Sequence, residues 1–224
     1  MQLVIGNKNY SSWSLRAWLL LKSFAVLFDE INVSLAQPGL TERLRQFSPT
    51  SRVPVLIDNE KTFWDSLAIC EYISEQYLDG KGWPAEPAIR GQARSITCEM
   101  HAGFTALRNE LPMNCRARRR VSITQQCRND IARIDHIWSH YPTSQTDQQQ
   151  PWLFGDFCIA DCFYAPVVLR VVTYDIPMSN AASAYVRSML NHAALQTWLS
   201  EAQQETEMLP EDEKGEQSQN GRNF

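Results

Sequence analysis

The sequence predicts a small α/β module followed by an all-helical module. Strand and helix patterns alternate through the first 80 residues, a Gly- and Pro-rich segment interrupts them at 79–84, and strand signals almost vanish afterwards. We therefore expect an α/β domain over residues 1–79, a linker over 80–85 and a helical domain over 86–210. Residues 211–224 are polar and acidic, which predicts a disordered tail.

Short apolar runs and helical spacings alternate in the first module. Residues 3–5 form an apolar run ending at Gly6, which predicts a buried strand. Apolar side chains recur every three or four positions in 13–24, which predicts a helix, and a serine cluster stands where helix N-caps are favoured. Further strands are expected at 28–35, 53–57 and 61–63, and further helices at 37–47 and 65–78.

The second module shows helical spacing. We expect helices near residues 86–111, 121–140, 159–174, 181–191 and 194–205. Residues 142–151 begin and end with proline and are otherwise polar, which predicts an exposed loop. The order of the two modules narrows the fold class without identifying a function.

Composition excludes several classes of protein. The 224 residues are 44% hydrophobic and 21% charged, as in an ordinary globular protein. Residues 201–224 carry seven acidic and two basic side chains, a net charge of −5. The whole chain has a net charge of −4, so residues 1–200 are nearly neutral. That balance argues against nucleic-acid binding. Neither a membrane span nor a signal peptide is predicted, and the six cysteines lack a secreted-scaffold spacing, which favours a reduced, cytoplasmic protein.

A serine pair at the start of the first predicted helix is the first candidate site. Ser11 and Ser12 stand where unpaired N–H groups and the helix dipole favour an anion. A serine hydroxyl there can donate to a thiolate and lower the pKa of the thiol. Plain N-capping is the alternative interpretation.

Two further segments could bind a ligand. Pro54 at the start of a strand leaves a backbone edge that could pair with an extended, peptide-like ligand, although an ordinary edge-strand proline is the alternative. Asp65 or Ser66 begins the next helix. A ligand carboxylate could bind Ser66 and the helix amides, and Asp65 could bind an ammonium, whereas capping alone would account for both residues.

In this order and spacing, the three segments resemble the cytosolic glutathione transferase superfamily from residue 1 to about 210. Residues 48–56, Ser-Pro-Thr-Ser-Arg-Val-Pro-Val-Leu, are similar to the family pattern N-P-x-x-x-V-P-x-L. Residues 65–73 resemble its pattern of an acidic residue followed by S-x-A-I-x-x-Y-I/L. The Ser-Ser-x-Ser-x-Arg stretch from Ser11 resembles serine-type bacterial members, most closely the zeta class.

The resemblance implies a thioredoxin-like α/β N-terminal domain, an all-α C-terminal domain and a homodimer. It implies glutathione as co-substrate, no metal, and detoxification of small electrophiles by attack of the bound thiolate. Glutathione-dependent isomerase, dehalogenase or peroxidase chemistry on the same site is an alternative, as is a non-catalytic binding or regulatory module. The resemblance implies that Ser12, or else Ser11, contacts the glutathione thiolate, and that Val53, before a cis Pro54, pairs with the cysteinyl unit. It also implies that Asp65 and Ser66 hold the γ-glutamyl end and that Arg52 lies near the glycine carboxylate.

The helical half holds the substrate-site candidates. Met100, His101 and Phe104 follow the linker on the helix that lines the electrophile cleft in this family, although ordinary packing is the alternative. Arg170 stands in an apolar helix, so its charge should be paired or face a cleft. Zeta-class isomerases bind the substrate carboxylate with an arginine further along this helix, where this chain has Thr173.

Other polar residues fit structural roles. Cys158 stands where the family has a Ser or Thr N-cap, and Asp161 can accept from its N–H as in a capping box. Cys158 and Cys162 could suggest a metal or redox pair, but two buried small side chains are the simpler interpretation. Residues 116–133 are basic and could attract an anionic substrate or partner, or form a solvated face.

Overall fold

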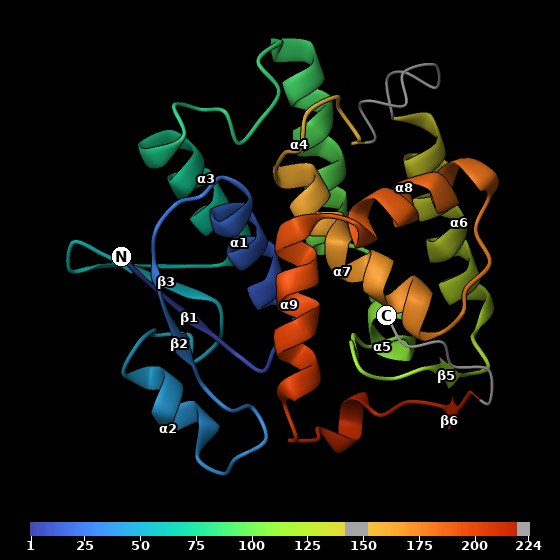
Figure 1. Cartoon of the computed structure of the whole chain (residues 1–224), viewed down its shortest axis with the longest axis horizontal. Coiled ribbons are helices and arrows are strands. Elements are labelled where there is room, and N and C mark those ends of the chain that lie inside the picture. The colour runs from blue at the N-terminus through green and yellow to red at the C-terminus, as the bar shows by residue number, and fades with distance from the viewer. Residues whose placement is uncertain (142–151, 219–224) are drawn as a thin grey trace.

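The N-terminal half of the computed structural model, which describes residues 1–141 and 152–218, is built on a mixed β-sheet (Figure 1). Its elements are β1 (Gln2–Ile5), α1 (Ser12–Ser23), β2 (Asp29–Asn32), α2 (Leu40–Arg45), β3 (Val55–Asp58), β4 (Lys61–Trp64) and α3 (Ser66–Tyr77). The strand order is β2-β1-β3-β4, with β1 parallel to β2 and antiparallel to β3. The predicted order of strands and helices is confirmed.

Alternation along β1 assigns each face of the sheet to different helices. Leu3 and Ile5 join the core cluster formed with α1 and α3, whereas Val4 joins a smaller cluster with Leu44 of α2 and with Val55. Successive side chains of a strand point to opposite faces, so the helices cover both faces of the sheet. The first of these clusters continues into the C-terminal half, so the α1–α3 face joins the two halves.

The C-terminal half is mainly helical and is organised around a buried helix, α7. Its elements are α4 (Pro87–Ala102), α5 (Thr105–Glu110), β5 (Arg119–Arg120), α6 (Gln125–His140), α7 (Ile159–Thr173), α8 (Asn180–Leu190), α9 (Ala193–Gln204), the 3-10 helix η1 (Pro210–Asp212) and β6 (Glu216–Gln217). Nearly every residue of α7 is buried. The expected all-helical second half is confirmed, with a short β5–β6 ladder added.

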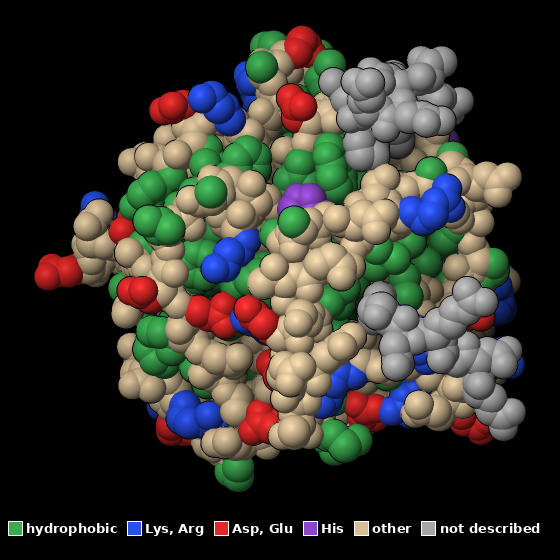
Figure 2. All heavy atoms as spheres, viewed as in Figure 1, with side chains coloured by type: hydrophobic (Ala, Val, Ile, Leu, Met, Phe, Trp, Pro, Cys, Tyr) green, Lys and Arg blue, Asp and Glu red, His purple; other side chains and the backbone are tan. Residues whose placement is uncertain are grey.

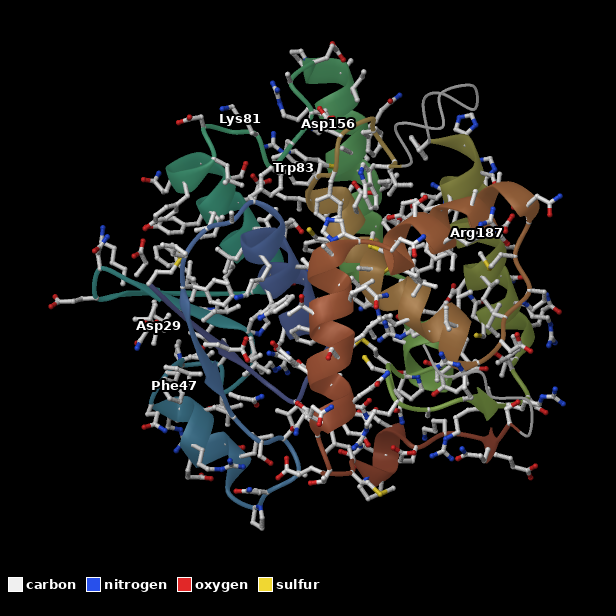
Figure 3. The ribbon with its side chains drawn as sticks, viewed as in Figure 1. Asp29, Phe47, Lys81, Trp83, Asp156 and Arg187 are labelled. Carbon is white, nitrogen blue, oxygen red and sulfur yellow. The ribbon has the colours of Figure 1, made fainter. Side chains whose placement is uncertain are left out.

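The segment between α3 and α4 contains the predicted linker. Lys81 points to solvent, whereas Trp83 turns inward toward the helices (Figure 3). The indole Nε1 of Trp83 donates to Glu71 at 3.0 Å, and the carbonyl of Gly82 accepts from the N–H of Ile159 at 2.9 Å. The linker therefore binds both to α3 and to the start of α7.

Two predictions of local structure are wrong. The helix expected over 86–111 is split after Ala102, because Gly103 is extended and Phe104 takes a positive φ of 57° as it packs into the core. The tail expected to be disordered from residue 211 is ordered through 218, where η1 and β6 follow α9 and β6 pairs with β5. Contacts with basic and polar side chains, described below, hold this segment.

The loop expected at 142–151 and the tail residues 219–224 lie outside the described residues. Within 1–141 and 152–218, none of the helices has the length and apolar character needed to cross a membrane.

Candidate functional site

The start of α1 places two neighbouring serines in different surroundings. Ser11, which precedes α1, donates through its hydroxyl to Oγ of Ser14 at 2.7 Å, and Ser14 Oγ also accepts from the N–H of Gly6 at 3.2 Å. Ser12 Oγ instead accepts from Nη2 of Arg170 at 3.2 Å. Within the described ranges no side chain caps α1, so the N–H groups of its first turn favour an anion in front of the helix.

A cavity of about 380 Å³ opens beside Ser12. It is lined by Tyr10, Ser11, Ser12, Trp13, Leu35, Leu40, Leu44, Ser51, Arg52, Val53, Arg108, Pro112, Met113, Arg170 and Asp212. Both halves of the chain contribute to this lining, which includes three guanidinium groups and one carboxylate. The cavity therefore combines a serine hydroxyl with a mainly cationic surface.

A second cavity, of about 480 Å³, adjoins the first. It is lined by Trp13, Thr50, Arg52, Val53, Pro54, Trp64, Asp65 and Ser66. Because Trp13, Arg52 and Val53 line both cavities, the two form one groove past the Val53–Pro54 peptide. That peptide bond is cis, as the resemblance implies.

The start of α3 presents an unsatisfied hydroxyl to this groove. Ser66 is 1% exposed, and its Oγ has no hydrogen-bond partner among the described residues. A buried polar atom left unpaired costs about 1–3 kcal/mol, which a hydrogen-bonding ligand would offset. Asp65 beside it accepts from the N–H of Leu67 at 2.8 Å, and its Oδ2 lies 3.1 Å from Nε2 of His101.

The three candidates that follow the linker lie in different places. His101 is half-buried, pairs with Asp65 and meets Trp13 edge-on, with the ring centroids 5.4 Å apart. Burial lowers the pKa of His101, and the Asp65 carboxylate opposes that shift. Met100 and Phe104 are buried in the core cluster. The structure thus places His101 against Asp65 and Trp13, which line the groove, and it buries Met100 and Phe104 in the core, in line with the packing alternative.

The sequence context of Arg170 requires its charge either to be paired or to face a cleft, and in the structure Arg170 both has hydrogen-bond partners and lines a cavity. It lines the Ser12 cavity, and its guanidinium donates to the backbone carbonyls of Leu111 and Pro166 as well as to Ser12. Burial, with a smaller contribution from the positive charge of Arg108, lowers the pKa of Arg170 to about 10. The guanidinium therefore remains protonated at neutral pH.

Sequence reasoning missed several residues of this groove. Tyr10, Trp13 and Arg108 line it beside the predicted residues, and Asp212 reaches it from the C-terminal segment. Arg108 lies over the Trp13 ring with its guanidinium carbon 4.9 Å from the centroid. Tyr10 and Trp13 adjoin the serine pair in the sequence, and that position could have indicated a place in the site. No sequence pattern connects Arg108 or Asp212 with the site.

The acidic C-terminal segment is the partner of the basic stretch after α5. Arg116 donates to the backbone carbonyls of Glu205 and Glu207, and Arg119 forms an ion pair with Glu213. The sequence interpretation allowed an acidic partner or a solvated face for residues 116–133. For the first part of that stretch, the acidic partner is the same chain. The opposite charges of the two segments were the signal for this contact.

Cys158 and Cys162 have the buried, structural position expected of them. Both side chains are buried, and burial raises the pKa of both thiols. The carboxylate of Asp161 accepts from the N–H of Cys158 at 3.0 Å, as the capping-box interpretation predicts.

Comparison with known proteins agrees with this geometry. Residues 10–76 match the family model of the glutathione S-transferase N-terminal domain. A holo maleyl pyruvate isomerase, described as a bacterial zeta-class glutathione S-transferase, superposes with a TM-score of 0.71 at 19% identity, covering 92% of this chain and 100% of that one. A Burkholderia glutathione transferase homologue with bound glutathione gives a TM-score of 0.68 at 23% identity, covering 90% and 97%.

Another similar protein is named for a starvation response and not for a reaction. A stringent starvation protein A homologue from Pasteurella multocida is 22% identical over 151 residues, which is 67% of each chain. The solved structures share the two-domain fold, and the family model covers the part that holds the serines, Pro54 and Ser66. On these grounds residues 10–76 form a glutathione S-transferase N-terminal domain, and the chain shares the two-domain fold of these solved glutathione transferases.

Proposed function

We propose that this protein is a glutathione transferase that ionises the thiol of bound glutathione at Ser12 and directs the thiolate to a small electrophile. The observation that carries the proposal is the continuous groove that joins Ser12 at the start of α1 to Ser66 at the start of α3, past the cis Val53–Pro54 peptide. An extended tripeptide with an anion at each of these helix starts matches that arrangement.

Each end of glutathione has a partner in the groove. The α-carboxylate of its γ-glutamyl unit would bind the unpaired Ser66 hydroxyl, and its ammonium would bind Asp65. The cysteinyl unit would pair with the backbone of Val53, and Arg52 would lie near the glycine carboxylate. The thiol would then face Ser12, and glutathione itself would be the nucleophile.

The contacts of the two serines favour Ser12 over Ser11 for the thiolate. The Ser11 hydroxyl donates its hydrogen bond to Ser14 Oγ, so it has no proton left to donate to a ligand thiolate. The Ser12 hydroxyl accepts from Arg170, which leaves its own proton available for the cavity. An ordinary thiol has a pKa near 8.5, and one charge-assisted hydrogen bond together with a helix N-terminus can lower it by about two units.

The direct test is calorimetric titration with reduced glutathione in two buffers of different ionisation enthalpy. We expect binding with proton release near neutral pH. Ser12→Ala should bind glutathione without that proton release, because the thiol pKa returns toward its ordinary value. Ser11→Ala is the matched control and should retain proton release. Unchanged proton release in Ser12→Ala would contradict the serine assignment.

Two other functions follow from the comparisons. The structural neighbour named as an isomerase makes glutathione-dependent isomerisation a candidate on the same groove, and product analysis distinguishes it from conjugation. The second candidate is a binding or regulatory module, because the name of the stringent starvation protein A homologue states no reaction. Absence of glutathione binding at millimolar concentration would favour that module. We expect a homodimer in either case.

A further inference from the structure

Each of the three nitrogens of the Arg170 guanidinium donates a hydrogen bond. Nε donates to the carbonyl of Leu111 at 2.8 Å, Nη1 to the carbonyl of Pro166 at 3.2 Å and Nη2 to Ser12 Oγ at 3.2 Å. The side chain is buried. The two carbonyl contacts fix the plane of the guanidinium, so the direction of its third bond, to Ser12, is fixed as well.

This bond determines where the Ser12 proton can point. A serine hydroxyl has one proton and two acceptor sites, and a guanidinium can only donate. Arg170 therefore fills one acceptor site of Ser12 Oγ and cannot receive its proton. Ser12 lines the cavity beside α1, so the remaining direction for that proton is into the cavity. Without Arg170, that acceptor site would be empty and the hydroxyl could turn its proton away from the cavity.

The charge of Arg170 acts in the same direction. Beyond the effect of burial, Arg108 lies near enough for its positive charge to lower the pKa of Arg170, and the charges of both lower the pKa of Arg16, so this end of the cavity is cationic. Asp212 is the carboxylate that faces Arg170 from the C-terminal segment. A thiolate placed against the Ser12 hydroxyl would therefore meet a hydrogen-bond donor with a fixed positive charge behind it.

We propose that Arg170 is a positioning residue for Ser12: its guanidinium holds the hydroxyl with the proton toward the cavity, where it donates to the thiolate of bound glutathione. This inference rests on the proposed function and adds the group that orients the serine. It gives a role to a buried charge 158 residues away in the sequence.

The test measures the pKa of the thiol in the protein–glutathione complex, from the ultraviolet absorbance of the thiolate as the pH is varied. Arg170→Met should raise that pKa by about one unit, which lowers the thiolate fraction about tenfold at pH values below it. Arg170→Lys keeps the charge and a donor, and should give about half of that shift or less. If Arg170→Met does not fold, Arg170→Lys and Arg170→Gln carry the comparison, with the larger shift in Arg170→Gln.

Two further variants separate positioning from a general effect of charge. In a Ser12→Ala background, Arg170→Met should shift the thiol pKa by about half a unit or less, because an effect that acts through Ser12 is lost with Ser12. Arg108→Met removes a positive charge from the same cavity but has no bond to Ser12, so its shift should be smaller than that of Arg170→Met. Equal shifts from Arg108→Met and Arg170→Met, or additive shifts in the double variant, would overturn the positioning role.

The outcomes distinguish this inference from the proposed function. If Ser12→Ala raises the thiol pKa and the Arg170 variants leave it unchanged, the transferase proposal stands and the role of Arg170 is wrong. If the unmodified protein binds no glutathione, both are wrong. A thiol pKa that rises in Arg170→Met, recovers in Arg170→Lys and depends on Ser12 supports the inference.

Discussion

At the scale of single residues, Asp65 connects the two halves of the molecule. It has a positive φ of 72°, its Oδ1 accepts from the N–H of Leu67 in α3, and its Oδ2 contacts His101 of α4. A ligand ammonium at Asp65 would share that carboxylate with His101. The contact between these two side chains therefore links the α3 end of the groove to the helical half.

This pair predicts a measurable pH dependence of stability. Burial, aided by the charges of Arg16 and Arg108, lowers the pKa of His101, whereas Asp65 raises it. Just below about pH 6.5, this histidine thus binds a proton more readily in the unfolded chain than in the folded protein. Its contribution to the free energy of unfolding is therefore largest above that pH and is lost as the pH falls. We expect His101→Gln to lose less stability than the unmodified protein between about pH 7 and about pH 5, by urea denaturation.

The matched control is His136→Gln, which changes an exposed histidine on α6. It should keep the pH dependence of the unmodified protein. An identical pH dependence in His101→Gln would show that His101 does not titrate differently in the folded and unfolded states.

The residues of the groove also show how far sequence reasoning reaches. Local patterns could single out Ser12, Pro54 and Ser66 as candidates, because each stands at or just before the start of a helix or strand, whereas their roles came from the family resemblance. The bond from Arg170 to Ser12 could not be found, since a contact across 158 positions leaves no periodic signal. The sequence indicated only that a charge in an apolar helix needs a partner.

At the scale of elements, α7 depends on one buried carboxylate. Asp161 accepts from the N–H of Cys158 at 3.0 Å, from the N–H of Leu153 at 3.2 Å and from the hydroxyl of Tyr185 at 3.1 Å. It therefore fixes the start of α7 to the preceding loop and to α8. Burial raises the pKa of Asp161 to about 6 although these donors oppose the shift, so its contribution to stability decreases as the pH rises through that value.

Removing this carboxylate should destabilise the fold. Asp161→Ala leaves two backbone N–H groups and the Tyr185 hydroxyl without their acceptor, which we expect to lower the free energy of unfolding by about 2–4 kcal/mol. Urea denaturation followed by circular dichroism measures the change. Asp156, an exposed residue just before α7 (Figure 3), provides the control, and Asp156→Ala should change stability by about 0.5 kcal/mol or less. Similar losses in both variants would refute the role given to Asp161.

The order of elements was predictable from hydrophobic spacing, but some of their ends were not. Apolar spacing continues through residues 86–111, and the break after Ala102 depends on Phe104 entering the core with a positive φ. Burial of one aromatic side chain thus outweighs the helical pattern around it. The disordered tail was mispredicted for a related reason, because polar composition does not show which polar partners lie nearby.

At the scale of the whole molecule, the segment after α9 ties the N-terminal loop before α1 to the helical half. Figure 1 shows this segment running along the lower edge from α9 to β6, where Figure 2 shows acidic and basic side chains interspersed. The carboxylate of Glu205 accepts from the N–H groups of Lys8 and Asn9 at 2.6 and 3.0 Å. Glu213 accepts from the hydroxyl of Tyr10 at 2.6 Å.

Because this loop leads directly into Ser11 and Ser12, the C-terminal segment should control how firmly the candidate thiolate site is held. Glu205→Ala leaves the N–H groups of Lys8 and Asn9 unpaired, so we expect a loss of about 1–3 kcal/mol in stability and faster hydrogen exchange of the amides in residues 7–12. Mass spectrometry of peptides from the exchanged protein locates the effect. Glu211→Ala, an exposed acidic residue of the same segment, should leave exchange in 7–12 unchanged. If Glu205→Ala left that loop equally protected, the loop would be held by its own contacts, and the acidic segment would only cover it.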